Sequence, residues 1–184
     1  MGRLNPKATS RNTGWQMLYE GIGAAFPVTK NNLTAVAAMD SVLIAGNTLH
    51  IGDLIRIRGQ VGAQATSGTP AALTFRATIG ALVTGGAQIA TANLTCAVPP
   101  ATTHGLNFES VSRVSSSTAL TSLNNGFTNS RINTAEAIGS FPDGFTTTLP
   151  TGTFADDQNI FAAALFADAL QQCTLHWWTV EVLQ

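Results

Sequence analysis

The feature that most constrains the fold is a strict two-residue alternation over residues 54–61, which have the sequence Leu-Ile-Arg-Ile-Arg-Gly-Gln-Val. One side of an extended chain would carry Ile55, Ile57, Gly59 and Val61, and the other side would carry Arg56, Arg58 and Gln60. A period of two is the geometry of a β-strand and not of a helix. The segment therefore predicts a strand with one face in a core and one face in water.

Similar signals recur along the chain, separated by glycine, proline and asparagine turns. They cover residues 15–20, 73–79, 88–96, 106–114 and 175–183. With the less regular segments, this gives about seven or eight strands and no repeated strand–helix–strand unit. The pattern predicts an all-β chain folded as an antiparallel sandwich or barrel.

Two segments are ambiguous. Residues 34–44 are mildly apolar, and both strand and helix fit their middle. Residues 160–170 are rich in alanine and follow Asp156 and Asp157, which makes them the best helix candidate by propensity. The competing interpretation is a strand over 160–166 followed by a loop.

The last strand has large side chains on both faces. Leu175, Trp177 and Thr179 alternate with His176 and Trp178, and Glu181 and Leu183 continue the first set. A strand of this kind is typical of the middle of a sheet that is covered on both sides. We therefore expect residues 175–183 to be central.

The chain divides into a short arm and one domain. Residues 1–13 contain Arg3, Lys7 and Arg11 and no acidic residue, whereas the remaining chain is net acidic. The arm is either a frayed terminus or a basic segment that orders only against a partner. Residues 14–184 are expected to form a single β-sandwich domain, with a long irregular excursion around 115–155 where breakers are frequent.

Composition excludes several classes of protein. Charged residues make up only 10% of the chain, and Ala, Thr, Gly, Asn and Ser together make up half of it. Coiled coils need far more Glu, Lys, Leu and Arg, and charged disordered chains have fewer apolar residues. A net charge of −1 argues against direct binding of nucleic acid. The sequence contains no stretch of about 18 apolar residues, so no membrane span is predicted.

No local motif indicates catalysis or a cofactor. His50, His104 and His176 are far apart, and no zinc, phosphate-loop or nucleophile-elbow spacing is present. Cys96 and Cys173 are expected to be small buried hydrophobic residues, although a bridge between them stays open. We therefore expect no enzyme activity, no metal and no cofactor.

Arg56 and Arg58 share one face of their strand, and with Arg76 on the neighbouring strand they would form a basic stripe. One interpretation is a wet face on which the arginines lie flat over the sheet. The other is contact with an acidic partner surface, for which arginine's planar guanidinium is well suited.

Residues 42–59, with the sequence Val-Leu-Ile-Ala-Gly-Asn-Thr-Leu-His-Ile-Gly-Asp-Leu-Ile-Arg-Ile-Arg-Gly, resemble a pattern of tailed-bacteriophage virion proteins. In that pattern a short apolar strand leads into an Ala-Asn-Thr-Leu turn, then Gly-Asp, then a strand with alternating arginine. Residues 73–80 and 175–183 are similar to later strands of the same proteins. The resemblance covers roughly 34–96 and 160–183.

The resemblance implies a jelly-roll domain in a virus particle, usually trimeric, that acts as a capsid cement (decoration) protein or as a head or tail fibre. A cement protein would bind the major capsid protein or other virion proteins and would reach the virion during assembly in the host cytoplasm. Arg3, Lys7, Arg11, Arg56 and Arg58 are the residues expected to contact the capsid. The alternative is a fibre module that binds a host receptor or glycan.

Overall fold

The computed structural model describes residues 14–22, 26–31, 35–65, 71–96, 103–129, 145–166 and 171–184. Within these ranges the chain is all-β and contains no helix, so no helix in them could cross a membrane. The eleven strands of the described ranges are β1 (Gln16–Gly21), β2 (Val28–Asn31), β3 (Ala37–Ile44), β4 (Leu54–Ala65), β5 (Ala71–Gly80), β6 (Ala87–Cys96), β7 (Thr103–Val114), β8 (Ala119–Asn129), β9 (Thr146–Thr148), β10 (Gln158–Phe166) and β11 (Gln171–Leu183).

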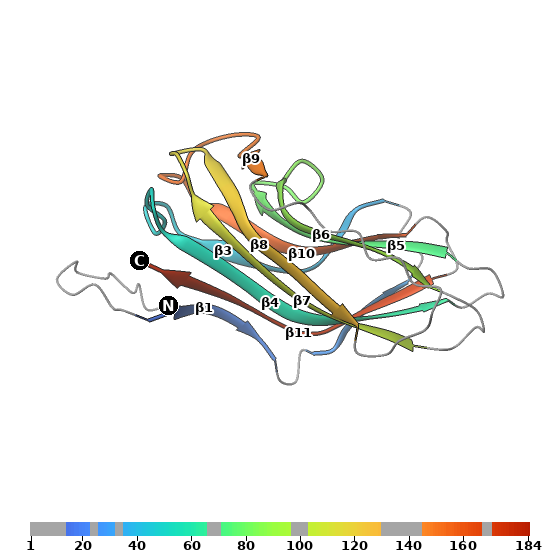
Figure 1. Cartoon of the computed structure of the whole chain (residues 1–184). Coiled ribbons are helices and arrows are strands. Elements are labelled where there is room, and N and C mark those ends of the chain that lie inside the picture. The colour runs from blue at the N-terminus through green and yellow to red at the C-terminus, as the bar shows by residue number, and fades with distance from the viewer. Residues whose placement is uncertain are drawn as a thin grey trace.

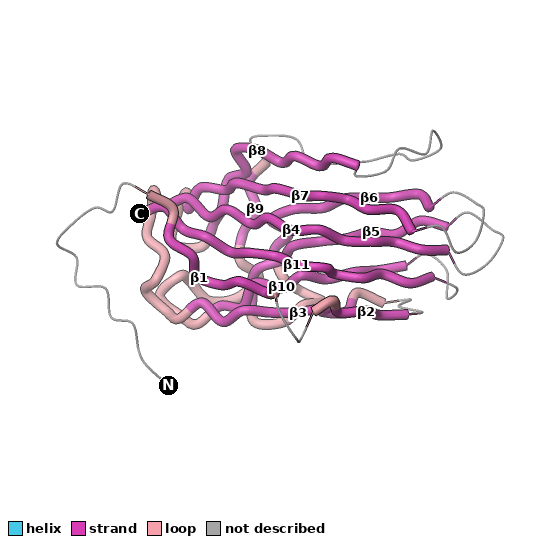
Figure 2. Tube along the Cα trace, turned by 90° about the horizontal axis from the view of Figure 1, so that it is seen from below, coloured by secondary structure: helices cyan, strands magenta, loops and turns pink. Residues whose placement is uncertain are grey.

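The strands form two antiparallel sheets packed face to face (Figure 1). The first sheet has the order β1-β11-β4-β7-β8-β9, and β2 also pairs with β11. The second sheet has the order β3-β10-β5-β6. Figure 2 shows the neighbouring strands of both sheets running along the same long direction.

This strand order is that of a jelly roll. If β1 with β2 is lettered B, and β3, β4, β5, β6, β7, β10 and β11 are lettered C to I, the sheets read B-I-D-G and C-H-E-F. Successive strands mostly cross from one sheet to the other, as two Greek keys require. The strands β8 and β9 extend the first sheet beyond G. The predicted antiparallel, jelly-roll-like sandwich is thus confirmed.

The core lies between the sheets and follows the alternation in the sequence. On β4, Ile55, Ile57 and Val61 are at most 1% exposed, while the arginines between them face outward. On β5, Phe75 and Ile79 are equally buried and face the first sheet. Burial of such side chains contributes about 1.5–3 kcal/mol each, which makes this layer the main source of stability.

Gly59 makes room for an aromatic contact at the centre of the core. It pairs with Phe108 on β7, and a Cβ at this position would lie 2.5 Å from the Phe108 ring. That ring in turn packs on Phe75 of the other sheet, with centroids 4.8 Å apart. The small residue in the β4 alternation is therefore required by close packing.

A polar clasp joins the sheets at the β1 edge. The Asp40 carboxylate on β3 accepts hydrogen bonds from the Tyr19 hydroxyl at 2.5 Å and from Trp178 Nε1 at 2.7 Å. Trp178 is fully buried and packs against the Tyr19 ring. Burial first, then the hydrogen bond to Asp40, raises the pKa of Tyr19 from 10.0 to about 12.

The helix predicted by propensity over 160–170 is wrong, and the competing strand is right. Residues 158–166 form β10, whose Ile160, Ala162 and Ala164 are buried at the core face. Pairing on both sides, with β3 and β5, outweighs alanine's preference for helix. Residues 37–44 are likewise a strand, and the rest of the candidate helix, 167–170, lies outside the described residues.

The irregular excursion expected around 115–155 is also corrected. Residues 119–129 form the long strand β8, which pairs with β7, and 146–148 form β9. Asparagine and glycine in this stretch favour turns, but pairing with β7 outweighs that preference. The stretch 130–144 lies outside the described residues.

The last strand is central, as predicted, but one of its residues faces the other way. β11 lies between β4 and the pair β1 and β2. A register shift between Leu175 and Trp177 leaves His176 exposed and turns Leu175 into the core with Trp178 and Val180. An extra residue in a β-bulge reverses the alternation in this way.

Two predictions depend on residues that the structure does not fully describe. The arm, residues 1–13, lies outside the described ranges, so the division into arm and domain stays a prediction. Cys173 is fully buried, with its Sγ 3.4 Å from Met39 Sδ. The side chain of Cys96 is not described, so a bridge between the cysteines stays untested.

Candidate functional site

The outer face of the first sheet carries the candidate arginines of β4. Arg56 lies directly opposite Glu181 of the adjacent strand β11, and Arg58, opposite Thr179, reaches it from the diagonal position. Arg56 Nε donates to Glu181 Oε2 at 2.5 Å, and Arg58 Nη2 donates to Glu181 Oε1 at 2.6 Å. The carboxylate is therefore shared by two guanidinium groups.

Glu181 is only 4% exposed, which makes this a largely desolvated cluster. Its side chain must be balanced by cations, because an unpaired buried carboxylate is costly. Arg58 is the more exposed partner, at 37% of its side chain against 20% for Arg56. The two arginines lie over their own sheet and neutralise an internal acid, with one positive charge left over.

Trp15 covers the Arg56 end of this cluster. The Arg56 guanidinium carbon lies 4.3 Å from the centre of the Trp15 ring, a cation–π contact. Trp15 immediately precedes β1, so the contact holds the start of the described chain against the outer face of the first sheet. Arg3, Lys7 and Arg11 themselves lie outside the described residues, and their predicted role stays a prediction.

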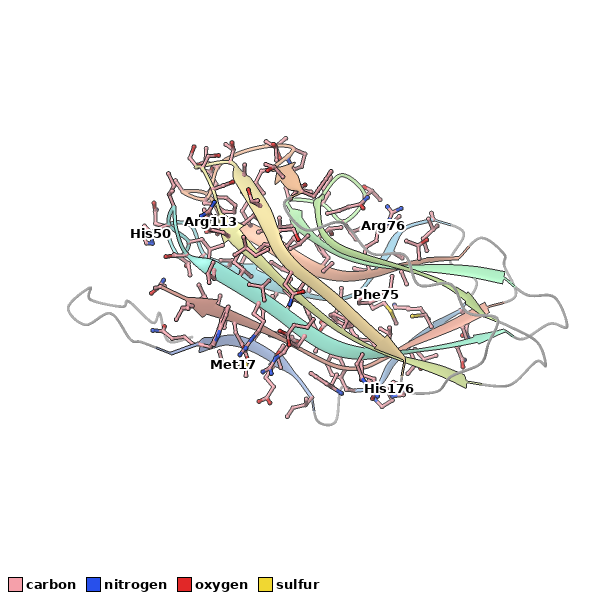
Figure 3. The ribbon with its side chains drawn as sticks, viewed as in Figure 1. Met17, His50, Phe75, Arg76, Arg113 and His176 are labelled. Atoms are coloured by element: carbon pink, nitrogen blue, oxygen red, sulfur yellow. The ribbon has the colours of Figure 1, made fainter. Side chains whose placement is uncertain are left out.

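Arg76 does not belong to this site. It lies on β5 in the second sheet, opposite Ala163 of β10, so the expected neighbouring position beside Arg56 and Arg58 is wrong. The chain crosses to the other sheet between β4 and β5, as the jelly roll requires. Figure 3 shows Arg76 on the far side of the sandwich from Met17 of β1.

Other charges on the same outer face have both signs. Glu20 faces outward beside Thr179, Glu109 pairs in register with Arg58, and Arg113 pairs with Leu54. The face is therefore a mixed field and not a basic stripe. Sequence reasoning missed Glu181, and its only signal was an acidic residue in an otherwise apolar strand.

A second feature is a shallow hollow of about 280 Å³ where three turns meet at one end of the sandwich. It is lined by residues 47 and 49–51 of the β3–β4 turn, by Val114, Ser116 and Ser117, and by Phe154 and Ala155. The exposed surface of its lining is mostly apolar. Figure 3 places His50 at this end, near Arg113.

Neither feature offers a catalytic arrangement. Within the described ranges no group of three or more His, Cys, Asp or Glu side chains could hold a metal ion. His50 Nδ1 lies 3.6 Å from Asp53 Oδ2, but the hollow presents no nucleophile paired with a base in the geometry that covalent catalysis needs.

Comparison with known proteins gives little. No protein-family model matches the chain, and no curated protein matches it. Among solved structures the chain is similar to the CBM2 module of the evolved Dit of Lactobacillus casei BL23 phage J-1. The identity is 13%, the TM-score is 0.33, and the alignment covers 77% of this chain and 67% of that one. A likeness this low carries no argument about function.

Proposed function

We propose that the protein is a non-enzymatic structural component of a bacteriophage particle, a cement or decoration protein that binds and stabilises the capsid as a surface trimer. The main support is the combination of the motif in residues 42–59 with the jelly-roll strand order that this motif implied. A fold alone does not fix a function, so the sequence resemblance carries the step to the virion.

The surface agrees with such a role. On the second sheet, the described outward side chains include a single charged residue, Arg76, among threonine, alanine and large apolar groups. Contact regions between proteins are depleted in charge at their centres. A protein that binds only the assembled shell stabilises it by mass action and needs no turnover.

The test uses shells that lack the protein. Purified full-length chain should co-sediment with such shells and should raise the temperature at which they open, and light scattering should give a mass three times 19.1 kDa. Removal of residues 1–13 should weaken shell binding. Full binding by the truncated chain would contradict the role of Arg3, Lys7 and Arg11.

The alternative is a tail or head fibre module that binds a host receptor or glycan. Trp15 and Trp177 lie partly exposed at the outer face of the first sheet, where an aromatic surface could stack on a sugar. Localisation by electron microscopy separates the two proposals. Density on the tail, without binding to shells, would replace the cement proposal by the fibre one.

A further inference from the structure

The hollow at the turn end leaves apolar surface in water. Ile51 is 68% exposed at its edge, beside the buried side chains of Leu49 and Phe154. An apolar hollow is the common form of a binding site.

The hollow is preformed, because backbone hydrogen bonds lock its three turns together. Asn47 N donates to Phe154 O, Gly52 N to Val114 O, and Phe154 N to Ser117 O, each at 2.9 Å. An occupant would therefore find the shape already made. It would lose only its own conformational freedom on binding.

The rim of the hollow is acidic. Asp156 and Asp157 directly follow the lining residue Ala155, and both are exposed. Their oxygens accept hydrogen bonds from Thr153 N at 2.9 Å and Gly46 N at 2.8 Å, and no ion pair joins either to a cation among the described residues. The charged residues near the hollow are then Asp53, Asp156 and Asp157 against Arg113, so the net charge at this end of the sandwich is negative.

The basic arm begins close to this rim. Gln16 pairs with Val182 near the chain's last residue, and Gln184 Nε2 donates to Thr48 O at 3.0 Å in the turn that lines the hollow. Trp15 covers Arg56, which is five residues from Ile51, so about 18 Å of extended chain spans that distance. Thirteen residues can reach about 45 Å.

We propose that the hollow binds this chain's own N-terminal arm, with Leu4 in the apolar hollow and the basic side chains of the arm against Asp156 and Asp157. The arm contains three cations and no acid, so its charge complements the rim. Its attachment beside the hollow gives it an effective concentration that a separate copy matches only at millimolar levels. This docking does not rest on the proposed capsid role; under that role a shell would compete with the hollow for the same three basic side chains.

Limited trypsin digestion of the full-length protein tests the proposal, because Arg3, Lys7 and Arg11 are all trypsin sites. Docking should protect them. The variant Ile51→Ser should be cut in the arm about tenfold faster than the native chain, as expected when closed states become less populated. Leu82→Ser is the matched control, because Leu82 is 70% exposed but does not line the hollow, and its cleavage rate should equal that of the native chain.

A second measurement follows the hollow itself. Deletion of residues 1–13 should shift the amide NMR signals of Ile51 and Ala155 and leave those of the 81–86 turn unchanged. Equal cleavage of the native chain and Ile51→Ser, or unchanged amide signals on deletion, would overturn the proposal. Protection that grows with protein concentration would also overturn it, because the arm would then come from a second copy. Shell binding by Ile51→Ser reports separately on the proposed function.

Discussion

The outer faces of the two sheets differ in how many charged side chains they carry. Among the described residues of β1, β4, β7 and β11, the outer face of the first sheet carries six charges, three acidic and three basic: Glu20, Arg56, Arg58, Glu109, Arg113 and Glu181. The second sheet carries Arg76 as the one charge among its described outward side chains. The acidic residue Asp40 of this sheet faces inward to Tyr19 and Trp178.

Each sheet thus has one carboxylate that serves two donors, but on opposite sides. Glu181 satisfies two cations on the outside, and Asp40 satisfies two neutral donors between the sheets. The first face is internally neutralised and can stay in water. The second face is left almost uncharged, which is the surface better suited to being covered.

The largest effect expected is from Glu181→Ala. It leaves the guanidinium groups of Arg56 and Arg58 side by side without their acid, and loss of one partner of a buried pair costs about 3–5 kcal/mol. Urea unfolding should show a loss of unfolding free energy near the lower end of this range, because Arg58 is partly exposed. Glu20→Ala, on the same face but exposed, should change the free energy of unfolding by less than about 0.5 kcal/mol.

Asp40→Ala should come next. It leaves the Tyr19 hydroxyl and the buried Trp178 Nε1 without their acceptor, at a cost of about 2–3 kcal/mol in unfolding free energy. Asp40→Asn keeps one acceptor oxygen and should lose less than half as much. Equal losses for the two variants would show that the charge, and not the hydrogen bonds, holds the clasp.

The clasp also predicts a pH dependence at the alkaline end. The pKa of Tyr19 is raised to about 12 in the fold, so its contribution to stability is complete below pH 10 and is lost as the pH rises from 10 to 12. The midpoint temperature of thermal unfolding should therefore fall more steeply with pH over this window for the native chain than for Tyr19→Phe. Parallel curves would contradict the link between Tyr19 and Asp40.

The smallest effects compare single arginines on the two faces. Arg56→Met removes one of the two cations of Glu181 and its contact with Trp15, and should cost about 1–2 kcal/mol. Arg76→Met should be close to neutral, because Arg76 Nε has no hydrogen-bond partner among the described residues. A larger loss for Arg76→Met in urea unfolding would reverse the contrast between the faces.

Local periodicity was enough to predict the sandwich and the orientation of β4. Ile55 and Ile57 are buried because the alternation of 54–61 fits one core face, and nothing distant is needed to see it. It failed for β10, where two neighbouring strands decide between helix and strand. Periodicity also placed Leu175 on the wrong face of β11, because a β-bulge has no clear signal in the sequence.

The site depended on register, which sequence alone does not supply. Glu181 is 125 residues from Arg56, and only the pairing of β4 with β11 brings them together. Arg76 follows Arg58 closely along the chain and still lies in the other sheet. The alternation within a strand indicates which of its faces is exposed to water. It does not indicate which neighbouring strand supplies the opposite charges.

The position of β11 also constrains how the protein is made. This final strand fills the gap between β4 and the pair β1 and β2, all of them synthesised much earlier. While the ribosome is still adding residues 171–184, β4 lacks one neighbour, and Arg56 and Arg58 lack their acid. The first sheet therefore cannot close before residues 171–184 have been synthesised, and pairing across such a long sequence separation makes folding slow.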